Sequence, residues 1–290
     1  MSFDYGEFTT RNLGFVTAAE QARMRDGAVF VVGVGGMGGA CFNALVRAGV
    51  GRLAIADIDR FEVSNLNRQI FAFIDTVGQQ KAEAAAAAAK RINPGLHLEV
   101  FGAEWTERLP DIAARYPVIV NGCDDVAASI HLYRTARSAR ATVIDAYASP
   151  LPSVTRVGPK APRPEARLGY PTVGKAWSAL TVQETRAAFM KELEYVMVHS
   201  SSARHVDLAA AAEMATGRRP RMSFAPMVLT TGNLMAYEAL GAVMGRPSRT
   251  DHRGWFLNPH APRVERPLPA PLAAAKRVLV RRFMARLLDR

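Results

Sequence analysis

The sequence predicts an α/β protein with a Rossmann-like, doubly wound, mainly parallel sheet flanked by helices, and with an additional C-terminal region of helix and strand. Short apolar runs alternate with segments of helical character, which is typical of βαβ units. The first run, residues 29–32, leads into Gly33, Gly35 and Gly38, which have the spacing of a nucleotide-binding turn. The second run, residues 52–56, ends in an acidic residue, as expected for such a turn.

Composition limits the class of protein. The chain has 290 residues, of which 49% are hydrophobic and 22% charged, values that suit a globular protein. Neither a secretory leader nor an apolar stretch of about 18 residues is visible, so we expect a cytoplasmic protein with no transmembrane segment. Two cysteines exclude a disulfide framework and a four-cysteine zinc site within the chain. The net charge of +11 is consistent with binding to nucleic acid or to an acidic partner. It is equally consistent with a proteome that is rich in Arg and Ala.

The glycine turn predicts a phosphate site. Its glycines allow a tight turn, close approach of backbone N–H groups to phosphate, and close packing of helix on strand. A helix over residues 37–48 follows, and its dipole and free N–H groups favour a bound anion. The residues expected to form the turn are Gly33, Gly35, Gly36 and Gly38.

Asp57 and Asp59 follow the second predicted strand. An acidic side chain at this point of such a fold holds a ribose hydroxyl group. This holds for NAD and for ATP, so Asp57 predicts a nucleotide without distinguishing the two. Asp59 is equally consistent with a surface loop residue.

The next polar stretch departs from the pattern of a dehydrogenase. Residues 64–69 include Asn65, Asn67, Arg68 and Gln69, and Lys81 lies in the first turn of a helix predicted over residues 79–92. Arg68 offers a planar fork to phosphate oxygens and Lys81 offers a point charge. Hydride transfer needs neither, whereas cleavage at an α-phosphate needs charge stabilisation. Taken alone, Lys81 would be an ordinary solvated helix residue.

Two aspartates follow another predicted buried strand, residues 117–120. A carboxylate at the carboxyl end of a sheet strand faces the ligand crevice and suits Mg²⁺. Either Asp124 or Asp125 is the candidate, and the other is expected to cap the helix predicted over residues 126–140.

From residue 29 to residue 94 the sequence resembles the ThiF/MoeB/HesA family, bacterial relatives of ubiquitin-activating enzymes. The matching segments, in order and spacing, are Gly33–Gly38, Ala56–Asp59, Asn65–Gln69, Val77–Lys81 and Ile92–Pro94. Residues 225–245 resemble the late apolar helix of the family, whereas residues 150–221 and 262–290 match poorly.

The resemblance implies ATP-dependent adenylation of a carboxylate, often the C-terminus of a ubiquitin-like protein or peptide, in a homodimer. Asp57 would hold the ribose, Arg68 and Lys81 would stabilise the phosphate charge, and Asp124 would bind Mg²⁺. Arg11 falls where the family places an arginine that reaches the site of the partner subunit. Relatives that form a thioester use a later cysteine, and none follows Cys123, so we expect adenylation without an obligatory thioester on this chain.

The resemblance also suggests a division of the chain. We expect an N-terminal arm at 1–27, an adenylation domain at 28–261 and a basic amphipathic tail at 262–290. Within the domain, residues 150–221 would form a crossover loop and variable helices. The Pro-, Gly- and Arg-rich stretch 150–175 is expected to be a loop.

Other functions remain open at this point. One is a relative of tRNA threonylcarbamoyl-adenosine dehydratase, which the basic charge and residues 67–70 also fit. Another is a non-catalytic scaffold that binds nucleotide. An NAD-dependent oxidoreductase is disfavoured by Arg68 and Lys81.

Overall fold

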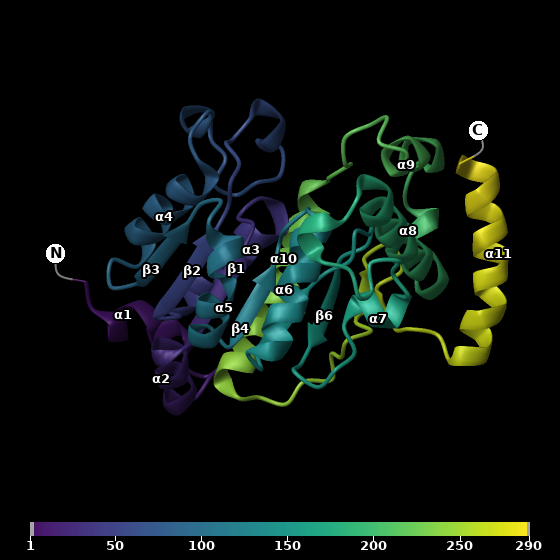
Figure 1. Ribbon diagram of the computed structural model, residues 1–290. Helices are drawn as coiled ribbons and strands as arrows, with labels where there is room; N and C mark the ends of the chain where they lie inside the picture. The colour runs from purple at the N-terminus through teal and green to yellow at the C-terminus, as the bar shows by residue number, and fades with distance from the viewer. Residues whose placement is uncertain (1–2, 289–290) are drawn as a thin grey trace.

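The computed structural model describes residues 3–288, built around an eight-stranded sheet (Figure 1). Its strand order is β3-β2-β1-β4-β5-β6-β7-β8; the first five are parallel and the last three join antiparallel. The predicted fold class is therefore confirmed. The strands are β1 (Ala28–Val32), β2 (Arg52–Ala56), β3 (His97–Phe101), β4 (Val118–Asn121), β5 (Thr142–Asp145), β6 (Ser153–Val157), β7 (Trp255–Asn258) and β8 (Arg263–Glu265).

Helices cover both faces of the parallel part because its strands are apolar on both sides. Alternate residues of β1 serve two cores: Val29 and Val31 pack with α3, α4 and α10, while Phe30 packs with α5 and α6. The α-helices in the described residues are α1 (Tyr5–Thr9), α2 (Ala18–Asp26), α3 (Gly36–Ala48), α4 (Lys81–Ile92), α5 (Trp105–Arg115), α6 (Val126–Ser138), α7 (Pro164–Leu168), α8 (Val182–His199), α9 (Leu208–Ala215), α10 (Ala225–Met244) and α11 (Ala270–Leu288).

From β1 the chain adds β2 and β3 on one side of the sheet and then β4 and β5 on the other. The direction in which strands are added therefore reverses between β1 and β4. In open α/β sheets this switch point forms a crevice outside the carboxyl ends of the strands. The glycine turn follows β1 and residues 122–125 follow β4, so the fold brings these two segments together.

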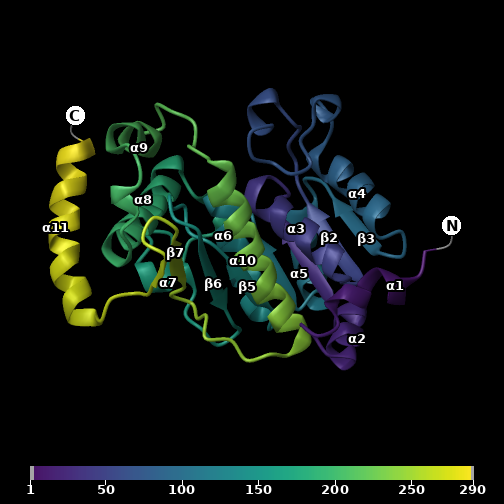
Figure 2. The ribbon, with the colours of Figure 1, turned by 180° about the vertical axis from the view of Figure 1, so that it is seen from behind.

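Helix α10 lies directly against α3, as the view from behind shows (Figure 2). The contact is close because a Cβ atom at Gly232 would lie 2.4 Å from the Met37 carbonyl oxygen. A Cβ at Gly36 would likewise lie 2.7 Å from Val228 Cγ1. Glycines on both helices therefore allow α10 to support the start of α3.

The stretch 150–175 is not simply a loop, contrary to the expectation from its prolines and glycines. It contains β6 and α7, and β6 pairs antiparallel with β5 on one side and β7 on the other. Pairing with strands distant in sequence stabilises β6, and local composition carries no sign of it. Glu165 of α7 is buried and forms an ion pair with Arg134 of α6 at 2.5 Å.

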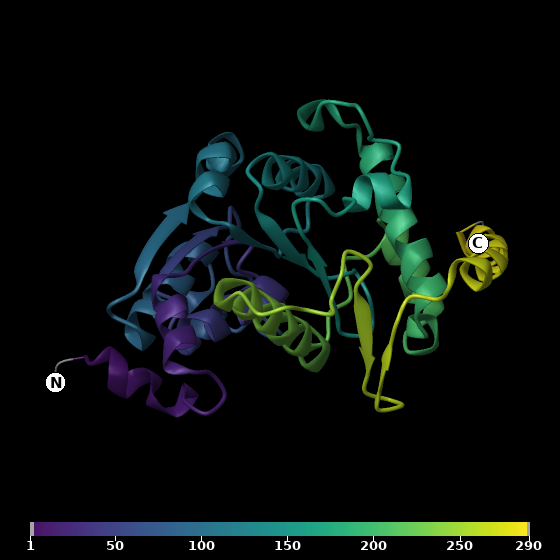
Figure 3. The ribbon, with the colours of Figure 1, turned by 90° about the horizontal axis from the view of Figure 1, so that it is seen from below.

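The C-terminal tail forms a hairpin strand, β8, and the helix α11, which lies beside α8 at the end of the molecule opposite the N-terminus (Figure 3). Ala273 and Val280 of α11 are buried against Val198 of α8. Leu272 and Leu279 are 60% and 65% exposed, so much of the predicted apolar face is not the packed face. Residues 289–290 of the predicted tail lie outside the described residues.

No helix in residues 3–288 is both long and apolar enough to cross a membrane.

Candidate active site

The glycine turn has the geometry that phosphate binding needs. Gly33 adopts φ +76°, and a Cβ there would lie 2.5 Å from the Gly122 carbonyl oxygen. At Gly38 a Cβ would lie only 1.9 Å from the Gly33 carbonyl oxygen. Gly35 is the N-cap of α3 and has no side chain to cap it, so the first N–H groups of the helix stay open to a ligand. Glycine is thus required here for backbone packing as well as for ligand access.

Asp57 ties the glycine turn to the end of β2. Its Oδ2 accepts a hydrogen bond from the Val34 N–H at 2.8 Å, and its Oδ1 accepts one from the Asp59 N–H at 2.9 Å. Burial raises the pKa of this carboxyl above its usual value, and the two backbone N–H groups oppose that rise. The Asp57 side chain therefore lies beside the glycine turn and lines the cavity.

Lys81 is only 7% exposed, although lysine is rarely buried. Its Nζ forms an ion pair with Asp59 Oδ2 at 2.9 Å. Both residues line the same cavity as the glycine turn. The buried cation at the start of α4 is thus paired with a carboxylate and lines the cavity that contains the predicted phosphate site.

Some side chains of the polar loop after Asp59 line the cavity, and others form hydrogen bonds that hold the loop itself. Arg68 and Gln69 line the cavity, and Gln69 Oε1 is buried without a hydrogen-bond partner among the described residues. Asn65 is buried and accepts a hydrogen bond from the Glu62 N–H, which fixes the loop. Asn67 does not line the cavity itself; its Nδ2 donates to the Ser223 carbonyl at 3.4 Å, and its Oδ1 accepts from Arg68 at 2.8 Å.

The two aspartates after β4 have different partners. Asp125 caps α6, since its Oδ1 accepts from the Ala128 N–H at 2.7 Å. Asp124 has a 76% exposed side chain and forms an ion pair with Arg221 at 2.6 Å. Asp124 is therefore the one available to a ligand in the crevice. No group of three or more metal-binding side chains occurs in the part of the chain described, so a metal here would depend on oxygens from a bound phosphate.

Arg11 lies far from this crevice. It is exposed in a short 3-10 helix (Thr10–Asn12) on the N-terminal arm, and it does not line the cavity. Its predicted role in the site of a second subunit stays a prediction.

The crevice opens into one cavity of about 1220 Å³. Besides the groups above, the cavity is lined by Phe189, Leu193 and Val196 of α8. Seven of the 11 methionines line it: Met37, Met190, Met197, Met214, Met222, Met227 and Met284.

Two charged groups beside the crevice were not found from the sequence. Arg221 pairs with Asp124, and its guanidinium lies over the Phe189 ring at 5.3 Å from the ring centroid. In the sequence it follows Arg218 and Arg219, and nothing distinguishes it from them. Glu192 accepts a hydrogen bond from the Ala148 N–H at 2.8 Å, and burial raises its pKa to about 7. A single glutamate in an amphipathic helix gave no sign of this environment.

Cys123 lies at the edge of the cavity next to Asp124. Burial raises the pKa of its thiol to about 12, so the thiol stays protonated at neutral pH. The environment does not provide the thiolate that a thioester-forming cysteine needs.

Known proteins share this fold and parts of this sequence. A model of the ThiF family matches residues 9–276. The sulfur carrier protein adenylyltransferase of Thermus thermophilus is 37% identical over 106 residues, 36% of this chain and 39% of that protein. The tRNA threonylcarbamoyladenosine dehydratase of Bacillus subtilis is 36% identical over 115 residues, 38% of this chain and 44% of that protein. The crystal structure of Escherichia coli MccB with ATP superposes with a TM-score of 0.63 at 13% identity, covering 92% of this chain and 73% of that one.

Fold and site together define an α/β protein of the Rossmann type with its crevice at the switch point of the sheet. The chain belongs to the ThiF family, because the family model matches nearly its whole length. The matches to the two curated relatives cover less than half of either protein, and the likeness to MccB concerns the fold.

Proposed function

We propose that this chain is an ATP-dependent adenylyltransferase that activates a carboxylate as an acyl-adenylate. The observation that carries the proposal is the position of Arg68 and Lys81, two cations that share the cavity with the glycine turn and Asp57. A relative named for adenylation of a sulfur carrier protein supports a protein or peptide C-terminus as the acceptor. Membership of the ThiF family supports the same reading.

In the proposed reaction an oxygen of the acceptor carboxylate attacks the α-phosphorus of ATP. The bond between that phosphorus and the oxygen bridging to the β-phosphate breaks, and pyrophosphate leaves. The open N–H groups at the start of α3 bind phosphate oxygens, and Asp57 accepts from the ribose hydroxyl groups. Arg68 and Lys81 stabilise negative charge that builds up on the phosphates. Gln69 Oε1, buried without a partner in the described structure, is free to accept from the nucleotide.

Asp124 is the residue that we propose to hold Mg²⁺. A magnesium ion bound through one or two carboxylates and substrate phosphates would neutralise phosphate charge. The exposed carboxylate of Asp124 fits that donor set once Arg221 turns from it toward the phosphates.

The test is exchange of radiolabelled pyrophosphate into ATP in the presence of candidate acceptors. We expect exchange that depends on a ubiquitin-like protein or peptide with a free C-terminal carboxylate. Exchange that instead requires tRNA would assign the chain to the dehydratase type. If no acceptor supports exchange and the Lys81→Ala variant keeps its biological activity, the chain is a scaffold.

A mixing experiment tests the proposed homodimer and Arg11. Arg11→Ala and Lys81→Ala would each be inactive alone. The two variants are mixed in equal amounts, unfolded and refolded together so that mixed dimers form. If Arg11 acts in the neighbouring subunit of a symmetric dimer, this mixture regains about a quarter of wild-type pyrophosphate exchange. A mixture as inactive as its components contradicts this role.

A further inference from the structure

Helix α11 is attached to the rest of the molecule along one side. Its Ala273 and Val280 are buried against Val198 of α8. Its Arg281 forms an ion pair with Glu194 of α8 at 2.9 Å. The helix lies at the edge of the molecule beyond α8, so its other side faces away from the sheet (Figures 1 and 3).

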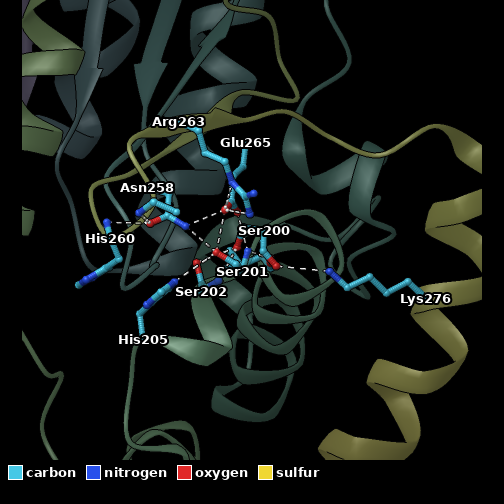
Figure 4. Close-up of polar contacts among 11 residues, drawn as sticks. Ser200, Ser201, Ser202, His205, Asn258, His260, Arg263, Glu265 and Lys276 are labelled. Carbon is cyan, nitrogen blue, oxygen red and sulfur yellow. Dashed lines mark hydrogen bonds and ion pairs between the residues drawn. The ribbon is translucent and has the colours of Figure 1, made fainter.

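A polar cluster fixes the inner side of α11 (Figure 4). Lys276 of α11 donates a hydrogen bond to the Ser200 carbonyl at 3.3 Å. Next to it, Glu265 of β8 accepts from the Ser201 N–H at 2.6 Å and from Asn258 Nδ2 of β7 at 2.8 Å. The cluster joins α11 to the end of α8 and to the β7–β8 hairpin, so the helix presents one fixed face to solvent.

The outer face of α11 carries a row of large apolar side chains. Leu272, Leu279 and Phe283 are 60%, 65% and 39% exposed. They are seven and four residues apart, a spacing that places them on one side of an α-helix. None of the three lines the cavity. An exposed apolar row beside polar residues marks a surface for interaction.

The same helix is strongly basic. The segment Ala270–Leu288 contains no Asp or Glu, and its five cations are Lys276, Arg277, Arg281, Arg282 and Arg286. Arg277 and Arg281 both pair with Glu194. Arg282 and Arg286 are exposed and have no ion pair within residues 3–288. Each of these two arginines lies three residues after a member of the apolar row, so they flank it.

This charge argues against a second copy of the chain as the occupant of the face. In a two-fold contact the same face meets itself, so Arg282 and Arg286 would oppose the same cations of the other copy. Because α11 has no carboxylate between Ala270 and Leu288, the helix could not neutralise them. The charge requires an anionic occupant.

The apolar row then favours an anionic lipid surface over nucleic acid. Nucleic acid phosphates would pair with Arg282 and Arg286 but would leave Leu272 and Leu279 beside a polar backbone. A bilayer provides phosphate headgroups for the arginines, and an apolar layer ~5–10 Å below them for the aliphatic side chains. Basic helices with Leu and Phe on one face lie in that boundary.

We propose that α11 docks this protein on an anionic membrane surface. The helix would lie in the plane of the interface, with Leu272, Leu279 and Phe283 among the acyl chains and Arg282 and Arg286 on lipid phosphates. The inference goes beyond the proposed adenylation and does not depend on it. Because the inner side of the same helix lines the cavity, docking would hold that cavity close to the membrane.

The test is co-sedimentation of the full chain with lipid vesicles. One set of vesicles contains phosphatidylcholine only, and the other contains phosphatidylglycerol as well. We expect at least about tenfold stronger binding to the anionic vesicles, as two unpaired arginines at the surface would give. High ionic strength should remove most of this preference, because salt screens the attraction between arginine and headgroup.

A matched pair of variants tests the apolar row. Leu279→Gln removes an exposed aliphatic side chain from α11, and Ile74→Gln removes one that is 80% exposed in the loop between β2 and α4. That loop lies far from α11 in Figures 1 and 2. We expect Leu279→Gln to weaken binding to anionic vesicles about tenfold, and Ile74→Gln to leave it unchanged. Circular dichroism checks the fold, and Leu272→Gln replaces Leu279→Gln if the latter does not fold.

A second pair tests the charge. Arg282→Gln removes one exposed cation from α11, whereas Arg91→Gln removes one from the exposed side of α4. Both variants change the net charge of the protein equally. We expect Arg282→Gln to weaken binding to anionic vesicles about fivefold and Arg91→Gln to change it less than about twofold.

Equal binding to the two kinds of vesicle, no sedimentation with either, or equal effects within either pair of variants would overturn the inference. A mobility shift of single-stranded RNA that Arg282→Gln weakens, without vesicle binding, would assign the face to nucleic acid. Loss of a dimer in Leu279→Gln, measured by sedimentation velocity and without vesicle binding, would assign it to contact between copies. None of these measurements involves pyrophosphate exchange, so the proposed function stands or fails separately.

Discussion

The two halves of the sheet supply the cavity in different ways. In the parallel half, the site groups come from the loops that follow β1, β2 and β4. The backbone is packed so closely there that a Cβ atom at Gly38 would lie 1.9 Å from the Gly33 carbonyl oxygen. In the antiparallel half, the lining comes from faces of α8, α9 and α11, made of Leu, Met and Ala side chains. The first half tolerates little change because its backbone is in contact, whereas apolar walls can be rebuilt with other apolar residues.

This difference separates chemistry from recognition. The residues of the proposed phosphate site are held by a fixed backbone geometry, and binding of the nucleotide would require that geometry. The walls from α8, α9 and α11 lie outside the proposed nucleotide site, so we expect their residues to vary without affecting nucleotide binding. Variants in the parallel half should abolish the reaction, and variants in the helical walls should change the acceptor.

The largest effect is expected at Gly38. Because a Cβ would overlap the Gly33 carbonyl oxygen, Gly38→Ala should lower the free energy of unfolding by about 3 kcal/mol or more and abolish nucleotide binding. Urea unfolding and nucleotide titration measure both. Gly241→Ala is the control on α10, where a Cβ would meet open space; it should be neutral or stabilise by about 0.5–1 kcal/mol. Similar values for the two variants would contradict this account of the turn.

Lys81 should affect the reaction more than the fold. Lys81→Ala is expected to lower pyrophosphate exchange about 10²–10³-fold, as loss of one charge-stabilising group does. Arg91→Ala, on the exposed side of the same helix, should leave exchange within about twofold of wild type, as surface changes usually do. Exchange at the wild-type rate in Lys81→Ala would remove the main argument for α-phosphate chemistry.

The burial of Glu192 in α8 can be tested through the pH dependence of the protein's stability. Its pKa is about 7 in the folded protein and lower in the unfolded chain, so the unfolded state loses its proton first as pH rises. Stability from this group is full below about pH 4.5 and declines until about pH 7. Glu192→Gln keeps an acceptor for the Ala148 N–H, and it should raise the melting temperature at pH 8 but not at pH 4. A gain that is equal at the two pH values would contradict the assigned burial.

The smallest expected effects separate the two aspartates after β4. Asp125→Ala removes the cap of α6 and should cost about 1 kcal/mol of stability, with modest loss of exchange. Asp124→Ala should leave the free energy of unfolding nearly unchanged, because its pair with Arg221 is exposed, but lower exchange and its response to Mg²⁺. Chemical denaturation and a magnesium titration distinguish the two variants. If Asp124→Ala instead lowers stability and Asp125→Ala instead weakens the response to Mg²⁺, the two roles are reversed.

Much of the parallel half follows from the sequence because its signals are local. The predicted strand at residues 52–56 is β2 as observed, and the glycine spacing coincides with the observed turn. Asp57 lies where the pattern places it, since strand ends and turn residues are near one another along the chain.

The antiparallel half could not be predicted in this way. Strand β6 exists because β5 and β7 pair with it, and β7 lies about a hundred residues further along the chain. The exposed apolar face of α11 was also not predictable, because helical periodicity defines a face but not which neighbour covers it.

The sequence by itself determined the fold class, the glycine turn, Asp57 and the cations of the proposed phosphate site, because glycine conformation and charge are properties of the residues themselves. Only the tertiary structure decided that Lys81 is buried beside Asp59, that Arg221 meets Asp124, and that the nucleotide crevice continues into an apolar space. These depend on contacts between segments far apart in the chain, and burial and pairing arise only when the chain has folded.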